Sequence, residues 1–179
     1  MRIGVVGCGN ISGAYLETLR RFPSVDVAAC ADLDPARARR LAQRFGIPET
    51  GTLEDVIGAD DIELILNLTP PLAHALVARA ALEAGKHVYG EKPLAVERAA
   101  GAQLVHAGQE RGLRVGSAPD TFLGRAWQTA RLLVDEGAIG RPLAGRANML
   151  IRGHETGIRI RRSTTSPAAG LCSTWGRTT

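Results

Sequence analysis

The sequence has few cysteines and lacks any long apolar segment. Its three cysteines, Cys8, Cys30 and Cys172, have neither the paired spacing of a zinc site nor the even number of a disulfide framework, so we expect small buried thiols and no metal site. No apolar run approaches the roughly 18 residues that span a bilayer. The N-terminus has no basic segment followed by an apolar stretch and a cleavage site. We therefore expect a cytoplasmic protein without a membrane partner.

Acidic residues are absent after residue 156. Segment 157–179 holds four arginines and no Asp or Glu, whereas segment 1–156 holds 18 basic and 18 acidic side chains. The net charge of +4 therefore belongs entirely to the last segment. Because the rest of the chain is balanced in charge, the sequence gives no reason to expect a nucleic-acid partner.

Short β-branched runs alternate with longer amphipathic stretches over the first 118 residues. This alternation predicts repeated β-α units around a parallel sheet, which is an α/β fold with a doubly wound sheet. Asp34 followed by Pro35 is typical of a helix start, and Gly85 and Gly112 stand where helices are expected to end. The predicted strands cover residues 2–6, 25–31, 62–67, 86–89 and 114–117, and the predicted helices cover 10–21, 35–45, 71–84 and 96–111.

The length of 179 residues accommodates one domain and part of a second. We expect the first domain over residues 1–120. A helix over about 121–136 would then lead into an alternating run over 143–152 that opens a new sheet, so residues 121–156 would connect to a second domain and begin it. Residues 157–179 show no apolar period and are expected to be irregular.

A glycine-rich turn follows the first predicted strand and opens the first predicted helix. Gly7, Gly9 and Ser12 have the G-x-G-x-x-G/A spacing, with Asn10 and Ile11 between the last two. In dinucleotide-binding folds the first glycine permits the tight turn, the second lets the backbone approach a pyrophosphate, and the third small residue lets the helix pack close to the strand. The phosphates then meet a helix N-terminus, which favours an anion. Tight turns without a ligand, and methyltransferases, use similar loops.

Asp32 follows the second predicted strand, 20 residues after Ser12. A carboxylate at this point accepts hydrogen bonds from the adenosine ribose hydroxyls of NAD and repels the 2′-phosphate of NADP. The alternative is an ordinary solvated turn residue. Arg37, Arg39 and Arg40 keep NADP open as the less favoured cofactor, although on a helix most of them would face water.

Polar side chains also follow the third and fourth predicted strands. Thr69 and Pro70 close the third strand and His74 lies just inside the next helix, whereas Glu91 and Lys92 end the fourth strand. Ligands bind at the carboxyl edge of open α/β sheets, so a hydroxyl, an imidazole and an ammonium gathered there are candidate site groups. Taken singly, Lys92 is more often a surface charge, and His74 could equally be a helix-start residue that is satisfied locally.

Taken in order, these motifs resemble the Gfo/Idh/MocA oxidoreductases. The resemblance rests on the glycine turn, on Asp32, on Thr-Pro-Pro at 69–71 with His74, on Ala-Leu-Glu-Ala-Gly-Lys-His-Val at 81–88 and on Glu-Lys-Pro at 91–93, and it extends over residues 1–156. It implies a Rossmann domain followed by the incomplete start of an open-faced α/β substrate domain. The implied activity is NAD-dependent hydride transfer involving a sugar, a cyclitol or a related secondary alcohol, in a parent protein that forms a homo-oligomer.

The resemblance also implies roles for the residues at the strand ends. Lys92 would lie beside the nicotinamide, hydrogen-bonded to the substrate hydroxyl and sharing in its proton transfer. This is chemically reasonable, because the hydroxyl must lose its proton when a hydride leaves the carbinol carbon, and a partly buried lysine can help take it up. Glu91 would orient Lys92 or contact the cofactor, while Thr69, Pro70 and His74 would line the ribose and nicotinamide side.

The chain departs from the family pattern beyond residue 120. Family members are roughly twice as long, and a later Asp and His usually complete their catalytic and sugar-binding set. Asp120 and Thr121 are possible substrate-side residues, although Asp120 also suits a helix N-cap. Residues 157–179 could be out of frame, since suitable codons shifted by one nucleotide read as family-like, glycine-rich sequence; sequencing the gene around codon 157 tests this. A non-catalytic dinucleotide-binding fragment or an inactive gene product is therefore the alternative function.

Overall fold

The computed structural model describes residues 1–119 and 121–148. The chain divides into two compact units, Met1–Pro119 and Asp120–Thr179. Among the described residues, no helix is both long and apolar enough to cross a membrane.

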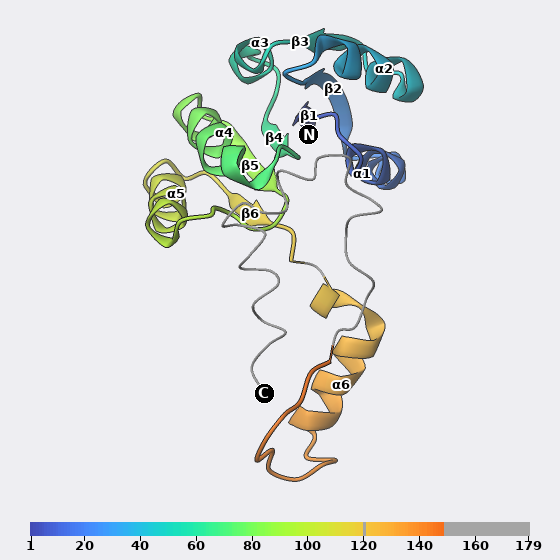
Figure 1. The fold of residues 1–179 in the computed structure, drawn as a ribbon, viewed down its shortest axis with the longest axis vertical. Coiled ribbons are helices and arrows are strands. Elements are labelled where there is room, and N and C mark those ends of the chain that lie inside the picture. Colours follow the sequence, from blue (N-terminus) through green and yellow to red (C-terminus); the bar gives the residue numbers. More distant parts are fainter. Residues whose placement is uncertain (120, 149–179) are drawn as a thin grey trace. The chain divides into compact units, whose positions relative to one another are not determined.

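The first unit contains a six-stranded, entirely parallel sheet with the strand order β3-β2-β1-β4-β5-β6 (Figure 1). This order confirms the predicted α/β doubly wound fold, with the reversal of strand order beside β1. The strands are β1 (Arg2–Val6), β2 (Asp26–Ala31), β3 (Glu49–Gly51), β4 (Leu64–Asn67), β5 (His87–Gly90) and β6 (Val115–Ser117), and the helices are α1 (Ser12–Leu19), α2 (Pro35–Phe45), α3 (Leu53–Gly58), α4 (Pro71–Glu83) and α5 (Arg98–Glu110).

Two apolar clusters cover the two faces of the sheet. Successive side chains of a strand point to opposite faces, so Val5 and Val6 belong to different clusters. The cluster that contains Val5 joins the sheet to α1 and α2, and the cluster that contains Val6 joins it to α3, α4 and α5. Helices on both faces leave only the ends of the strands accessible, which concentrates candidate ligand contacts at the loops.

The predicted helix ends are confirmed. Asp34 caps α2 by accepting a hydrogen bond from the Ala36 N–H, and Pro35 occupies the first helical turn. Gly85 and Gly112 have φ of +76° and +66° where α4 and α5 end.

Sequence reasoning missed β3 and α3. Both are short, since β3 has three residues and α3 has six, so neither shows a hydrophobic period. The N-terminus of α3 nevertheless carries a recognisable signal. The Thr52 side chain accepts from the Asp55 N–H, and Asp55 accepts from the Thr52 N–H, which is a capping box.

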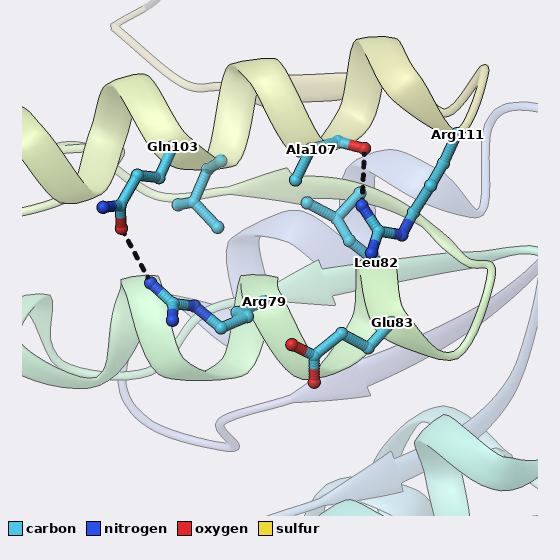
Figure 2. Close-up of a pocket in the computed structure, with 7 residues that line it drawn as sticks. Arg79, Leu82, Glu83, Gln103, Ala107 and Arg111 are labelled. Atoms are coloured by element: carbon cyan, nitrogen blue, oxygen red, sulfur yellow. Dashed lines mark hydrogen bonds between the residues drawn. The ribbon is translucent and has the colours of Figure 1, made fainter.

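A groove with a volume of about 280 Å³ lies between α4 and α5, and Figure 2 shows the residues that line it. Arg79 donates to Gln103 Oε1 at 3.0 Å across the groove, and Arg111 donates to the Ala107 carbonyl at 3.2 Å. The groove runs toward the C-terminal ends of both helices at Glu83 and Arg111. In parallel α/β sheets the helices run opposite to the strands, so these helix ends lie toward the amino edge of the sheet, away from the predicted site.

The second unit contains a short 3-10 helix, η1 (Thr121–Leu123), and the helix α6 (Arg125–Asp135), where one helix over 121–136 was predicted. The strand predicted over 143–152 is wrong for its described part, because residues 143–148 form no strand. A strand needs a partner for its backbone groups, and the part of the chain that the structure describes supplies none there. Asp120, the remainder of that strand and the segment 157–179 lie outside the described residues.

Candidate functional site

The loops that carry the predicted site residues leave the same edge of the sheet. Val6 pairs with Ala31 on β2 and with Asn67 on β4, and Asn67 pairs with Gly90 on β5. The next residue along each of these strands therefore leaves the sheet beside its neighbours at the carboxyl edge. This edge, next to the reversal of strand order, is where open α/β sheets bind ligands.

Gly7 is required by the fold itself. Its φ is +99°, and its N–H donates to the Ala31 carbonyl at 2.8 Å. A Cβ at this position would lie 2.6 Å from the backbone carbonyl carbon and oxygen of Leu68. The first glycine of the motif thus serves both the turn and a close approach between the loops that follow β1 and β4.

Gly9, unlike Gly7, is not required by contacts within the fold. A Cβ built there would meet no protein atom within 4 Å, so the fold does not explain why the residue is glycine. The space beside this backbone is what the approach of a pyrophosphate needs. The turn therefore fits a dinucleotide, and Gly9 is the residue that most directly indicates one.

Ser12 stabilises the glycine turn by a side-chain hydrogen bond. Its side chain is buried, and its hydroxyl donates to the Gly9 carbonyl at 2.6 Å. A larger residue would have to displace the packing between α1 and the sheet. Asn10 and Ile11 lie exposed on the turn at the start of α1, where a helix N-terminus favours an anion.

Asp32 ties the glycine turn to the end of β2. Its Oδ2 accepts from the Cys8 N–H and its Oδ1 accepts from the Asp34 N–H, each at 2.8 Å. The turn role that the sequence offered as an alternative is therefore present. Each carboxylate oxygen has a second acceptor position, and the side chain is only partly buried, so a ribose hydroxyl can still bind to it.

The arginines near Asp32 are engaged with another carboxylate. Asp34 Oδ2 lies 3.5 Å from Arg37 Nε and 4.0 Å from Arg40 Nη2, and all three side chains are about half exposed or more. Arg39 is exposed. Arginines that are paired with Asp34 are less able to bind the 2′-phosphate of NADP than an unpaired arginine beside Asp32 would be.

Asn67 organises the loop after β4 and was missed by sequence reasoning. It is buried, and its Nδ2 donates to the His74 carbonyl at 3.0 Å. Its Oδ1 accepts from the Thr69 N–H at 3.3 Å and from the Thr69 hydroxyl at 2.6 Å. A polar residue ending a strand that is otherwise buried and apolar, Leu64–Asn67, is the signal that could have revealed it.

His74 lies beneath the loops rather than on their surface. The ring is buried, with Nε2 2.7 Å from the Thr69 carbonyl and Nδ1 hydrogen-bonded to the Pro93 carbonyl. A neutral imidazole has one N–H, so it donates to one of these carbonyls in each tautomer. The structure thus favours the local role for His74, which joins the loops after β4 and β5, while Thr69 and Pro70 remain accessible at the edge.

Glu91 holds the loop after β5. Its Oε1 accepts from the Tyr15 hydroxyl at 2.7 Å, and its Oε2 accepts from the Lys92 N–H at 3.1 Å. Within residues 1–119 and 121–148, Glu91 forms no ion pair with the Lys92 ammonium. The carboxylate therefore acts on the backbone of Lys92 instead of on its amine.

Lys92 is exposed at the carboxyl edge. The partial burial expected for its side chain is therefore not seen in the described chain. The sequence contains only two lysines among 22 basic residues. The other, Lys86, is buried and donates to the Ala59 carbonyl at 2.7 Å. The rarity of lysine in a chain that otherwise uses arginine was a signal for Lys92 that sequence reasoning did not use. Lysine can lose its proton readily, whereas arginine cannot.

The prediction of buried thiols is confirmed for Cys8 and Cys30, while Cys172 lies outside the described residues. A hydrogen bond with Cys30, together with burial, raises the pKa of Cys8 far above its ordinary value. The Cys8 thiol is therefore neutral and adds no negative charge below the glycine turn. Thr121, the other possible substrate-side residue, lies exposed in η1 of the second unit.

Comparison with known proteins shows the family of this chain. A family described as an oxidoreductase family with an NAD-binding Rossmann fold matches residues 1–118. The chain belongs to the Gfo/Idh/MocA oxidoreductase family. The match covers the whole of the six-stranded sheet and every residue of the candidate site up to Lys92.

Relatives of this Gfo/Idh/MocA chain match it over a similar stretch. Inositol 2-dehydrogenase 3 of Saccharopolyspora erythraea is 35% identical over 147 residues, which are 80% of this chain and 43% of the relative. A variant of a 3-ketoreductase from Actinomadura kijaniata, solved with TDP-benzene and NADP, is 32% identical with a TM-score of 0.74, over 79% of this chain and 44% of its own. A protein from gentamicin A biosynthesis, solved with NAD, is 29% identical with a TM-score of 0.74, over 77% and 40%. This chain thus spans less than half the length of each.

Proposed function

We propose that the chain is the dinucleotide-binding half of an NAD-dependent oxidoreductase that transfers hydride between nicotinamide and a sugar, cyclitol or related secondary alcohol. The observation that carries this proposal is the convergence, at one edge of the sheet, of the glycine turn, Asp32 and the loop that ends in Lys92. The open space beside Gly9 supports the cofactor part of the proposal. Membership of the Gfo/Idh/MocA family supports the reaction class.

The proposed chemistry divides between the cofactor and Lys92. A bound nicotinamide supplies the hydride acceptor for oxidation of the alcohol. The unprotonated Nζ of Lys92 accepts the proton of the substrate hydroxyl, and in the reverse direction the protonated amine returns it. Glu91 holds the backbone of Lys92 in place, and substrate and cofactor together provide the burial that the described chain lacks around the amine.

Asp32, Thr69 and Pro70 bind the cofactor in this proposal. Asp32 accepts hydrogen bonds from the adenosine ribose through the acceptor positions that its backbone contacts leave open. Thr69 and Pro70 line the ribose and nicotinamide side from the loop after β4, and His74 supports that loop from beneath. NAD is favoured over NADP because the Asp32 carboxylate repels a 2′-phosphate.

The substrate and partners follow from the relatives and from composition. The relatives include an inositol 2-dehydrogenase and a 3-ketoreductase that was solved with a TDP ligand, which supports a small polyol or sugar substrate. The balanced charge of residues 1–156 argues against a nucleic-acid partner. A homo-oligomeric parent protein and a cytoplasmic location remain parts of this proposal.

A non-catalytic dinucleotide-binding module is the second candidate. The specific observation that favours it is the exposure of Lys92 at the carboxyl edge, because the described residues do not bury the amine that would take part in proton transfer. Turnover with NAD and a panel of polyols separates the two candidates. Binding of NADH without turnover of any polyol would support the module.

The test is a fluorescence titration of the purified chain with NADH and with NADPH, beside Asp32→Ala and the matched surface control Asp60→Ala. Saturable NADH binding that is weakened by Asp32→Ala but not by Asp60→Ala is the expected result. Tighter binding of NADPH would contradict the cofactor assignment. Binding of S-adenosylmethionine in place of both cofactors would favour a methyltransferase.

A further inference from the structure

A side-chain hydrogen bond joins the helix of the glycine turn to the loop of Lys92. The Tyr15 hydroxyl, on α1, donates to Glu91 Oε1 at 2.7 Å, between residues 76 positions apart. The other carboxylate oxygen of Glu91 accepts from the Lys92 N–H at 3.1 Å. The path from the glycine turn to the backbone of Lys92 therefore passes through two hydrogen bonds to one carboxylate.

This link is stronger than an ordinary surface contact. A hydroxyl that donates to an ionised carboxylate forms a charge-assisted bond, roughly twice as strong as a neutral one. Tyr15 and Glu91 are both partly buried, so water competes less for the bond than it would on an open surface. Tyr15 also lies in the first turns of α1, where its backbone N–H donates to the Ile11 carbonyl at 3.3 Å, so its backbone is tied to the turn that would hold phosphate.

We propose that Tyr15 is a positioning residue for Lys92. By fixing Glu91, Tyr15 holds the backbone of Lys92 at a set place relative to the glycine turn, so the cofactor-binding turn and the proton-transfer amine move as one unit. This inference rests on the proposed function for its importance to catalysis, but the positioning itself is a property of the chain and is testable without turnover.

The composition of the chain makes the test unusually clean. It has two lysines, Lys86 and Lys92, and two tyrosines, Tyr15 and Tyr89. Reductive methylation with carbon-13 labels both lysine amines and the α-amine of Met1, and Lys86→Arg and Lys92→Arg variants identify which NMR signal belongs to which lysine. Tyr89→Phe is the matched control, because it removes a phenolic hydroxyl from β5 instead of from α1.

We would record the methylated full chain as wild type, Tyr15→Phe and Tyr89→Phe without ligand. The expected result is that Tyr15→Phe shifts the Lys92 signal and leaves the Lys86 signal unchanged, whereas Tyr89→Phe shifts neither. An unchanged Lys92 signal in Tyr15→Phe would overturn the proposal. Shifts at both lysines would overturn it as well, because Tyr15 would then act on the fold as a whole.

Addition of NADH tests the coupling separately. In the wild type, NADH is expected to shift the Lys92 signal, and in Tyr15→Phe this shift is lost although fluorescence still reports binding. An equal NADH-induced shift in both proteins would contradict the coupling. If neither protein binds NADH, the proposed function fails, while the ligand-free spectra still decide whether Tyr15 positions Lys92.

Discussion

The contrast between Gly7 and Gly9 leads to a paired prediction. Gly7 has φ of +99°, and a Cβ there would lie 2.6 Å from backbone atoms of Leu68. An L residue in such a conformation costs about 1–3 kcal/mol, and forced overpacking costs a further 1–3 kcal/mol or so. Gly7→Ala should therefore lower the free energy of unfolding by roughly 2–6 kcal/mol. That is a large share of the about 5–15 kcal/mol typical of a domain.

Gly9→Ala should behave differently in the same assay. The added methyl group meets no protein atom within 4 Å, so the free energy of unfolding should stay within about 1 kcal/mol of wild type. The methyl group would, however, occupy the space proposed for the pyrophosphate. If overpacking there costs about 1–3 kcal/mol, NADH affinity should fall roughly ten- to a hundredfold.

Urea unfolding followed by circular dichroism, together with NADH fluorescence titration, measures both effects. We expect a low urea midpoint for Gly7→Ala, and a normal midpoint with weak NADH binding for Gly9→Ala. A wild-type midpoint for Gly7→Ala would refute the structural argument. Wild-type NADH affinity for Gly9→Ala would refute the assignment of that space to a ligand.

Three further changes test other parts of the account. Lys92→Ala should lower kcat of any NAD-dependent turnover by about 10²–10⁴-fold and leave NADH affinity unchanged, as kinetics and titration would show. Asn67→Leu removes the partners of buried groups in the loop after β4, so urea unfolding should show a loss of at least about 1–3 kcal/mol. Hydrogen bonds from the Thr52 backbone and side chain hold the pKa of Asp55 below its ordinary value of 3.8. Because its pKa is lowered, Asp55 stabilises the fold above about pH 3.8 and loses this effect as the pH falls through its folded-state pKa. In an acid titration, Asp55→Asn should therefore lose less stability than the wild type as the pH falls below 3.8.

Most of the fold could be predicted because most of its strands and helices carry local sequence signals. Buried parallel strands are continuous apolar runs, and α2 is marked by its Asp34 cap and by the glycine that ends it. The short elements β3 and α3 carried too few residues for a period, and β3 is defined by its pairing with β2, in which Ala29–Ala31 pair with Glu49–Gly51. Residues 143–148 show the converse, since an alternating pattern does not make a strand where the described part of the chain offers no partner strand.

The candidate site was predictable in its composition but not in its connections. The glycine spacing and Asp32 identified the turn, yet nothing local indicated that Asp32 would bind the Cys8 backbone. The sequence left two roles open for His74 and for Glu91, a ligand contact or a local one, and the contacts in the structure are with loop carbonyls for His74 and with Tyr15 and the Lys92 backbone for Glu91. Such contacts join segments that are distant in sequence, so they depend on the strand order, which a motif does not contain.

Amide chemical-shift mapping with NADH tests the central claim most directly, because it shows where on this chain a dinucleotide binds. We expect the perturbed backbone amides to cluster at the carboxyl edge of the sheet, in residues 7–12, at Asp32, at Thr69 and at Glu91. Perturbations confined to the groove between α4 and α5, near Arg79 and Arg111, or no perturbation at saturating NADH, would contradict it.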